Sequence, residues 1–103
     1  MTLPQLKTLL ETTALPVTYR AWPEKAAPPL PFLCYLCTGF DSLHADGLVY
    51  HLVTHVQVEL YTRLKDPEAE AKVEAALSGF HWKKEETYID TERCYMILYE
   101  IEV

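Results

Sequence analysis

The strongest constraint on the fold is the segment from Leu48 to Thr62, in which side chains alternate between two faces. One face carries Leu52, Thr54, Val56, Val58 and Leu60, and the other carries Val49, His51, Val53, His55, Gln57, Glu59 and Tyr61. A period of two residues is typical of a β-strand with one buried face. The segment therefore predicts a long or bent strand that forms the spine of a sheet, with Val56 and Val58 on the core face.

Two other segments have the capping residues and apolar spacing of helices. The first runs from Thr2 to Thr13, where Thr2 can cap the first turn and Pro4 lies early enough to be tolerated. Its apolar residues include Leu3, Leu6 and Leu10. The second begins at Asp66-Pro67-Glu68, a helix start with acidic side chains near the positive end of the dipole, and Gly79 is its natural stop. Its apolar stripe is Ala69, Val73, Ala76 and Leu77.

The remaining segments predict shorter strands and their connections. Val17 to Ala21 alternates weakly, Phe32 to Thr38 reads as a buried strand, and Gly39 to Gly47 reads as a polar connection. Phe80 to Ile89 and Cys94 to Val103 predict a terminal hairpin around Asp90–Arg93, with Tyr95, Ile97, Tyr99, Ile101 and Val103 on one face. The expected fold is α+β in the order α-β-β-β-α-β-β. It has a mostly antiparallel sheet of four to five strands, and two helices on one face.

Length and charge limit the classes of function. A chain of 103 residues makes one domain, residues 1–103, and half of its residues are hydrophobic, which excludes a disordered tail. No apolar run is long enough to span a membrane, and the N-terminal residues do not predict a secretion signal. The net charge of −6 argues against a dedicated nucleic-acid binder. Three cysteines, an odd number, favour a reducing, cytosolic setting.

Candidate catalytic and metal-binding motifs each have a plainer structural interpretation. Cys34 and Cys37 form a CxxC, but on a strand the two thiols face opposite ways and no helix dipole activates them. His51 and His55 share a strand face roughly 13 Å apart, too far to chelate one ion. Ser42 and His44 share a loop with two aspartates, without a nucleophile elbow. No Gly-rich phosphate loop is present. We therefore expect no catalytic residues, no metal and no cofactor.

The remaining candidates for a functional site are features of the surface. The segment from Trp22 to Pro31, here called the arm, contains Pro23, Pro28, Pro29 and Pro31, so we expect an extended loop. Long ordered loops commonly serve a purpose. Tyrosines are numerous for a small sheet, and tyrosine is enriched in subunit interfaces. An ordinary tyrosine-rich core with a floppy loop is the alternative interpretation.

Several stretches of the chain resemble one class of proteins in their order and in their residue pattern. They are residues 45–50 (ADGLVY), 56–62 (VQVELYT), 65–74 (KDPEAEAKVE), 88–92 (YIDTE) and 99–102 (YEIE). Together they resemble small tail-module proteins of prophages and siphophages of Gram-positive bacteria, over residues 15 to 103. Size and α+β pattern are similar to those of tail terminator and tail-completion proteins.

This resemblance implies a non-enzymatic virion protein whose subunits form a ring, a hexamer in that family, at the head-proximal end of the tail. The implied partners are identical subunits, the tail tube and head-completion proteins, with no sequence-specific nucleic acid and no membrane. The implied location is the bacterial host cytoplasm during assembly and then the virion tail. The interface residues that we expect are Trp22, Pro23, Pro28, Pro29, Phe40, His44, Tyr50 and Tyr61.

Other functions stay open at this point. Within the same class, a head–tail connector subunit is the runner-up, because no short motif in the sequence separates a terminator from a connector. In a different class, a small non-enzymatic binding module would use the arm to hold a single partner. An enzyme is the weakest alternative, because no convergent catalytic set of residues is visible.

Overall fold

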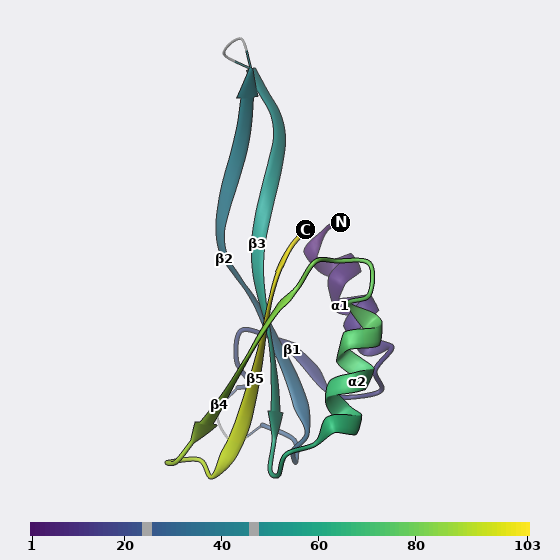
Figure 1. Ribbon diagram of the computed structural model, residues 1–103, viewed down its shortest axis with the longest axis vertical. Coiled ribbons are helices and arrows are strands. Elements are labelled where there is room, and N and C mark those ends of the chain that lie inside the picture. The colour runs from purple at the N-terminus through teal and green to yellow at the C-terminus, as the bar shows by residue number, and fades with distance from the viewer. Residues whose placement is uncertain (24–25, 46–47) are drawn as a thin grey trace.

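The computed structural model describes residues 1–23, 26–45 and 48–103, and the side chains of 43–45 and 48–51 lie outside that description (Figure 1). The elements follow the predicted order α-β-β-β-α-β-β. They are α1 (Leu3–Glu11), β1 (Val17–Tyr19), β2 (Phe32–Ala45), β3 (Leu48–Thr62), α2 (Pro67–Ala76), β4 (Lys83–Ile89) and β5 (Cys94–Glu102).

The strands form one five-stranded sheet in the order β1-β2-β3-β5-β4. The pairs β2–β3, β3–β5 and β4–β5 are antiparallel, whereas β1 pairs with β2 in parallel, so the sheet is mixed. This corrects the expectation of a mostly antiparallel sheet, and the arm provides the reason. Parallel neighbours need a crossover of about a dozen residues, and residues 20–31 return the chain from the end of β1 to the start of β2.

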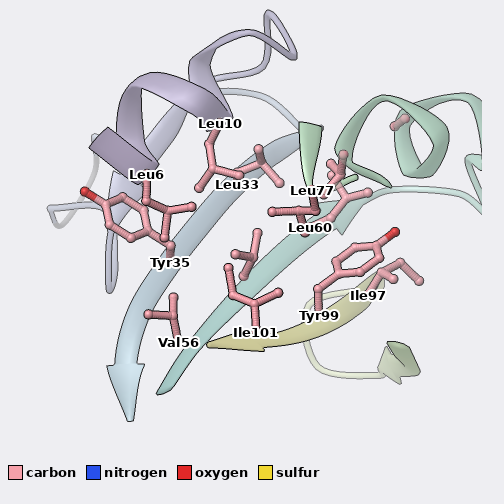
Figure 2. Close-up of a cluster of buried hydrophobic side chains, with 13 residues drawn as sticks. Leu6, Leu10, Leu33, Tyr35, Val56, Leu60, Leu77, Ile97, Tyr99 and Ile101 are labelled. Atoms are coloured by element: carbon pink, nitrogen blue, oxygen red, sulfur yellow. The ribbon is translucent and has the colours of Figure 1, made fainter. Parts of the chain in front are cut away.

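Both helices cover one face of the sheet, as expected, and the core lies between them and the strands (Figures 1 and 2). Val56, Val58 and Leu60 point into this core and are almost completely shielded from solvent, which confirms the predicted register of β3. The other members of the cluster are Leu6, Leu10, Leu33, Tyr35, Ala69, Val73, Leu77, Ile97, Tyr99 and Ile101. Each fully buried leucine or valine side chain contributes about 1.5–3 kcal/mol, so this cluster is the main source of stability.

The helix starts confirm the predicted caps. The Thr2 hydroxyl accepts a hydrogen bond from the Gln5 backbone N–H, and the Gln5 side chain accepts one from the Thr2 N–H, which makes a capping box. At α2 the Asp66 carboxylate accepts a hydrogen bond from the Ala69 N–H at 3.0 Å. The caps fix where each helix begins, and thereby which stripe faces the sheet. Among the described residues, neither helix has the length and apolar character needed to cross a membrane.

The expectation of a polar connection from Gly39 to Gly47 is wrong for most of that segment. Strand β2 continues to Ala45, because its backbone pairs with β3 up to Leu48. A register shift lies between Cys37 and Gly39, so Thr38 is the extra residue of a bulge. The result is a long β2–β3 hairpin that projects beyond the body of the sheet (Figure 1).

Candidate interaction surface

The projecting part of the hairpin comprises Gly39–Ala45 of β2 and Leu48–Val53 of β3. In the described residues, Asp41–Ala45 pair only with Leu48–Val53, because β5 ends beside Thr54, which exchanges backbone hydrogen bonds with Val103. The molecule is therefore elongated, with extents of 51 × 28 × 24 Å. An isolated two-stranded ribbon is marginal in water, and its outer edges carry unpaired backbone groups. Such a ribbon is a natural site for a neighbouring molecule to pack.

Two large apolar side chains on this hairpin are exposed. Phe40 is 61% exposed and Leu52 is 54% exposed. Phe40 lies opposite Thr54, and Leu52 lies opposite Ser42, so the two side chains are diagonal neighbours on one face. In β3 this is the face that also carries Val56 and Val58. The apolar face of the core thus continues onto the hairpin, where no helix covers it.

The base of the hairpin is held by a histidine between two acids. His55 Nε2 lies 2.5 Å from Asp41 Oδ2 on β2, and His55 Nδ1 lies 3.7 Å from Glu102 Oε1 on β5. The hydrogen bond to Asp41 raises the pKa of His55, and partial desolvation opposes this shift. Protonated His55 therefore ties both strands of the hairpin to the last strand of the sheet.

Trp22, at the start of the arm, packs on the face of the sheet away from the helices. The Trp22 ring packs edge-on against Phe32 with a centroid separation of 5.6 Å, and Phe32 packs against Tyr61 at 5.3 Å. The Phe32 side chain points to this face because side chains alternate along a strand and its neighbour Leu33 points into the core. We expected Trp22 and Tyr61 at an interface. In the structure both rings pack against Phe32 of the same chain.

The other expected interface residues lie apart from this cluster. In the arm, Pro23 and Pro29 are exposed and Pro28 is half-buried. Phe40 lies on the hairpin, where the sequence predicted a loop. His44 and Tyr50 belong to the backbone of β2 and β3, and their side chains lie outside the described residues. Of the expected set, Phe40 is the one large apolar side chain that the described structure leaves mostly exposed.

A network of charges between α2 and β4 was not predicted. Glu70 on α2 is buried, and its two carboxylate oxygens lie 2.8 Å from Lys65 Nζ and 2.7 Å from Lys84 Nζ. Lys84 also contacts Glu74 at 2.8 Å, and the Tyr99 hydroxyl donates to that same carboxylate. Burial raises the pKa of Glu70, but the two lysines outweigh burial and lower it. These contacts fix helix α2 to strand β4 of the sheet.

The signal for this network was present in the sequence. The sequence alone suggests a solvated strand with cross-strand pairing for Lys83-Lys84-Glu85-Glu86. The alternation of a strand places Lys84 and Glu86 on the same face as Tyr88. In the structure that face looks toward α2, so these two side chains meet residues of the helix region.

The cysteines occupy ordinary packing positions. Cys34, Cys37 and Cys94 are all free thiols, and the CxxC lies on β2 as predicted. Cys34 lies opposite Glu59, whereas Cys37 lies opposite Val56 on the core face, so the two thiols point to different sides of the sheet. Burial, followed by the charge of Glu59, raises the pKa of Cys34 to about 11. At neutral pH this thiol is protonated and a poor nucleophile.

An open hollow of about 740 Å³ lies beside the base of the hairpin. Phe80, Trp82 and Ile101 give it apolar walls, and His55, Lys83 and Glu102 add charged or titratable groups. In the described parts of the chain, no three His, Cys, Asp or Glu side chains are placed to hold a metal ion. The hollow therefore offers space and mixed polarity without a convergent reactive set among the described residues.

Neither a protein-family model nor any curated protein sequence matches this chain.

Proposed function

We propose that this protein is a tail terminator or tail-completion subunit of a phage or prophage, which works as a ring at the head-proximal end of the tail. The observation that carries this proposal is the β2–β3 hairpin, with Phe40 and Leu52 exposed on one face and no partner strand beside it in the described residues. A projecting ribbon with apolar side chains is suited to join subunits by surface complementarity.

Ring formation fits the position of this hairpin. It projects from one end of an elongated molecule, so its exposed face is far from most of the remaining surface. A contact between two different surfaces of identical subunits is heterologous, and such contacts close into rings when the rotation permits. The acidic charge of −6 suits a ring through which DNA passes without adhering. Assembly would take place in the host cytoplasm, and the ring would remain in the virion tail.

The test is light scattering coupled to size exclusion across a concentration series, with and without purified tail tubes, followed by negative-stain imaging. We expect rings at high concentration or on tube ends, and we expect the Phe40→Ser/Leu52→Ser variant to lose them while keeping its fold. The control is Leu64→Ser, which removes a leucine that is also exposed (73%, against 54% for Leu52) from the body instead of the hairpin.

The outcomes separate the alternatives. Binding to purified heads, and not to tubes, would identify a head–tail connector. A protein that stays monomeric at millimolar concentration and binds neither tubes nor heads would contradict the proposal and favour a small binding module.

A further inference from the structure

His55 lies at the point where the sheet narrows to the two strands of the hairpin. Its neighbour Thr54 exchanges backbone hydrogen bonds with Val103 at the end of β5, and beyond Thr54 the described strands β2 and β3 pair only with each other. The bulge at Thr38 lies at the same level of β2, and the Thr38 hydroxyl donates a hydrogen bond to the His55 carbonyl oxygen at 3.4 Å. Because a bulge bends its strand, the hairpin leaves the sheet at a bend beside His55.

Both nitrogens of the His55 ring face carboxylates. Glu102 lies directly opposite His55 on β5, with its Oε1 3.7 Å from Nδ1, and Asp41 is the diagonal neighbour on β2, with its Oδ2 2.5 Å from Nε2. A neutral imidazole has one N–H and one lone pair, so it can donate to one carboxylate and must turn its lone pair to the other. An imidazolium has an N–H on each nitrogen and a positive charge that attracts both. The pair of contacts therefore fits the protonated ring.

The other charged or titratable groups near His55 do not take its place. Glu100, Lys83 and His81 line the same hollow as His55, and Lys83 lies opposite Glu100 in the β4–β5 pair. Within the described parts of the chain, neither Lys83 nor His81 forms an ion pair with the two carboxylates that hold His55. When His55 loses its proton, these carboxylates therefore face a neutral ring from both sides of β3, with no described cation between them.

We propose that His55 is a proton-operated clamp, which holds the projecting part of the hairpin closed when the ring is protonated and lets its base open when the ring is neutral. The contacts of the clamp are at the surface, since Asp41 and Glu102 are mostly exposed, and surface ion pairs add little to the stability of a whole protein. A two-stranded ribbon is itself marginal in water, so the same weak contacts change the fraction of time for which its strands stay paired.

The direction of the pH dependence follows from these contacts. The hydrogen bond to Asp41 raises the pKa of His55 while the hairpin is closed, and opening the base removes that bond and returns the pKa toward its ordinary value of about 6.5. Protons therefore stabilise the closed hairpin. This stabilisation is fully present below the ordinary pKa and is lost as the pH rises through the pKa of the closed form.

Hydrogen exchange followed by mass spectrometry tests the clamp in the full-length protein, at about pH 6 and about pH 8.5. Low micromolar protein keeps self-association out of the measurement, so the result does not depend on the proposed ring. Observed rates are divided by intrinsic rates, which removes the direct effect of pH on exchange. We expect protection of the amides of residues 41–45 and 48–53 to fall by about threefold or more at the higher pH, while peptides from β5 and α2 keep theirs. Equal protection of the hairpin at both pH values, or an equal fall in β5 and α2, would overturn the proposal.

Three variants assign the effect to His55. His55→Gln keeps a hydrogen-bond donor but does not titrate, so its hairpin should be equally protected at both pH values. Asp41→Asn removes one carboxylate, so it should lower the pKa of His55 in an NMR titration of the ring and reduce the pH effect. His81→Gln is the matched control, because His81 lines the same hollow and has no acidic partner in the described residues, and it should keep the whole pH effect. A pH effect that persists in His55→Gln, or that disappears in His81→Gln, would contradict the clamp.

Discussion

Lys84 on β4 reaches the buried carboxylate of Glu70 on α2, with its Nζ 2.7 Å from Oε1. This pair joins an edge strand to a helix that belongs to a different part of the chain. The Lys84 side chain is about one-third exposed and Glu70 is nearly closed off from solvent, so the pair is stronger than an ordinary surface ion pair.

We expect Lys84→Met to lower the free energy of unfolding by roughly 1–2 kcal/mol at neutral pH, since Glu70 keeps only Lys65 as a partner. The matched control is Lys83→Met on the opposite face, which forms no ion pair in the described residues and should change stability by less than about 0.5 kcal/mol. Urea unfolding measures both. Equal losses in the two variants would contradict the role of the pair.

The same pair makes the stability of the protein depend on pH. The pKa of Glu70 is lowered in the folded protein, so its contribution is present above the unfolded carboxyl pKa and is lost as the pH falls through the folded value. The stability difference between wild type and Lys84→Met should therefore shrink as the pH falls from 7 toward 3. A difference that stays constant over this range would show that Glu70 is not the titrating partner.

Val58→Asp should unfold the protein or cost several kcal/mol, because Val58 is completely buried between Tyr35 and Tyr99 of the flanking strands. Leu52→Asp introduces the same charge on the same face of β3, but on the exposed hairpin, where we expect a loss below about 1 kcal/mol. Thermal unfolding followed by circular dichroism distinguishes them. An unchanged melting temperature in Val58→Asp would mean that the register is wrong by one residue.

Trp22→Ala should destabilise the monomer by roughly 1–3 kcal/mol, because it removes the ring that packs on Phe32. Trp22→Phe is the control: it keeps an aromatic ring, and the indole N–H has no acceptor among the described residues, so its loss is small. Denaturant unfolding of the monomer provides the measurement. Unchanged stability of Trp22→Ala together with weaker self-association would place Trp22 in an interface instead.

The thiols should differ in reactivity. Burial raises the pKa of Cys34 to about 11 and also raises the pKa of Cys94, so both should react with an alkylating reagent at pH 8 only after unfolding. Cys37 is partly exposed and should react first, and Cys37→Ser should abolish that fast phase. The double variant of Cys34 and Cys37 to alanine should keep its fold with modest packing losses. Stoichiometric zinc retained after gel filtration would contradict this interpretation of the cysteines.

Local sequence signals predicted most elements because their causes are local. Thr2 and Asp66 cap helices through neighbours three residues away, and the alternation of Val56, Val58 and Leu60 needs only a sheet with one covered face. The parallel placement of β1 was missed because it depends on where the arm returns, which is a long-range property. The arm's prolines predicted an extended loop, and they carried no signal that this loop is the crossover.

The hairpin was missed for a different reason. Residues 39–45 are rich in turn-forming and polar types, and on local propensity they favour a loop. They form a strand because Leu48–His55 offers a partner in register, and cross-strand pairing overrides local preference. The Glu70 network was missed similarly, since two separate elements must meet before its charges become neighbours.

Strand β3 belongs both to the hairpin and to the centre of the core, and this has a mechanical consequence. Backbone hydrogen bonds between antiparallel strands lie perpendicular to the strand axis. A pull on the hairpin along that axis therefore loads the bonds that join β3 to β2 and β5 in shear, many at once, instead of peeling them apart in turn. The hairpin acts as a tether whose anchor is the middle of the sheet, so tension applied at its exposed end is borne by the most deeply buried residues of the molecule.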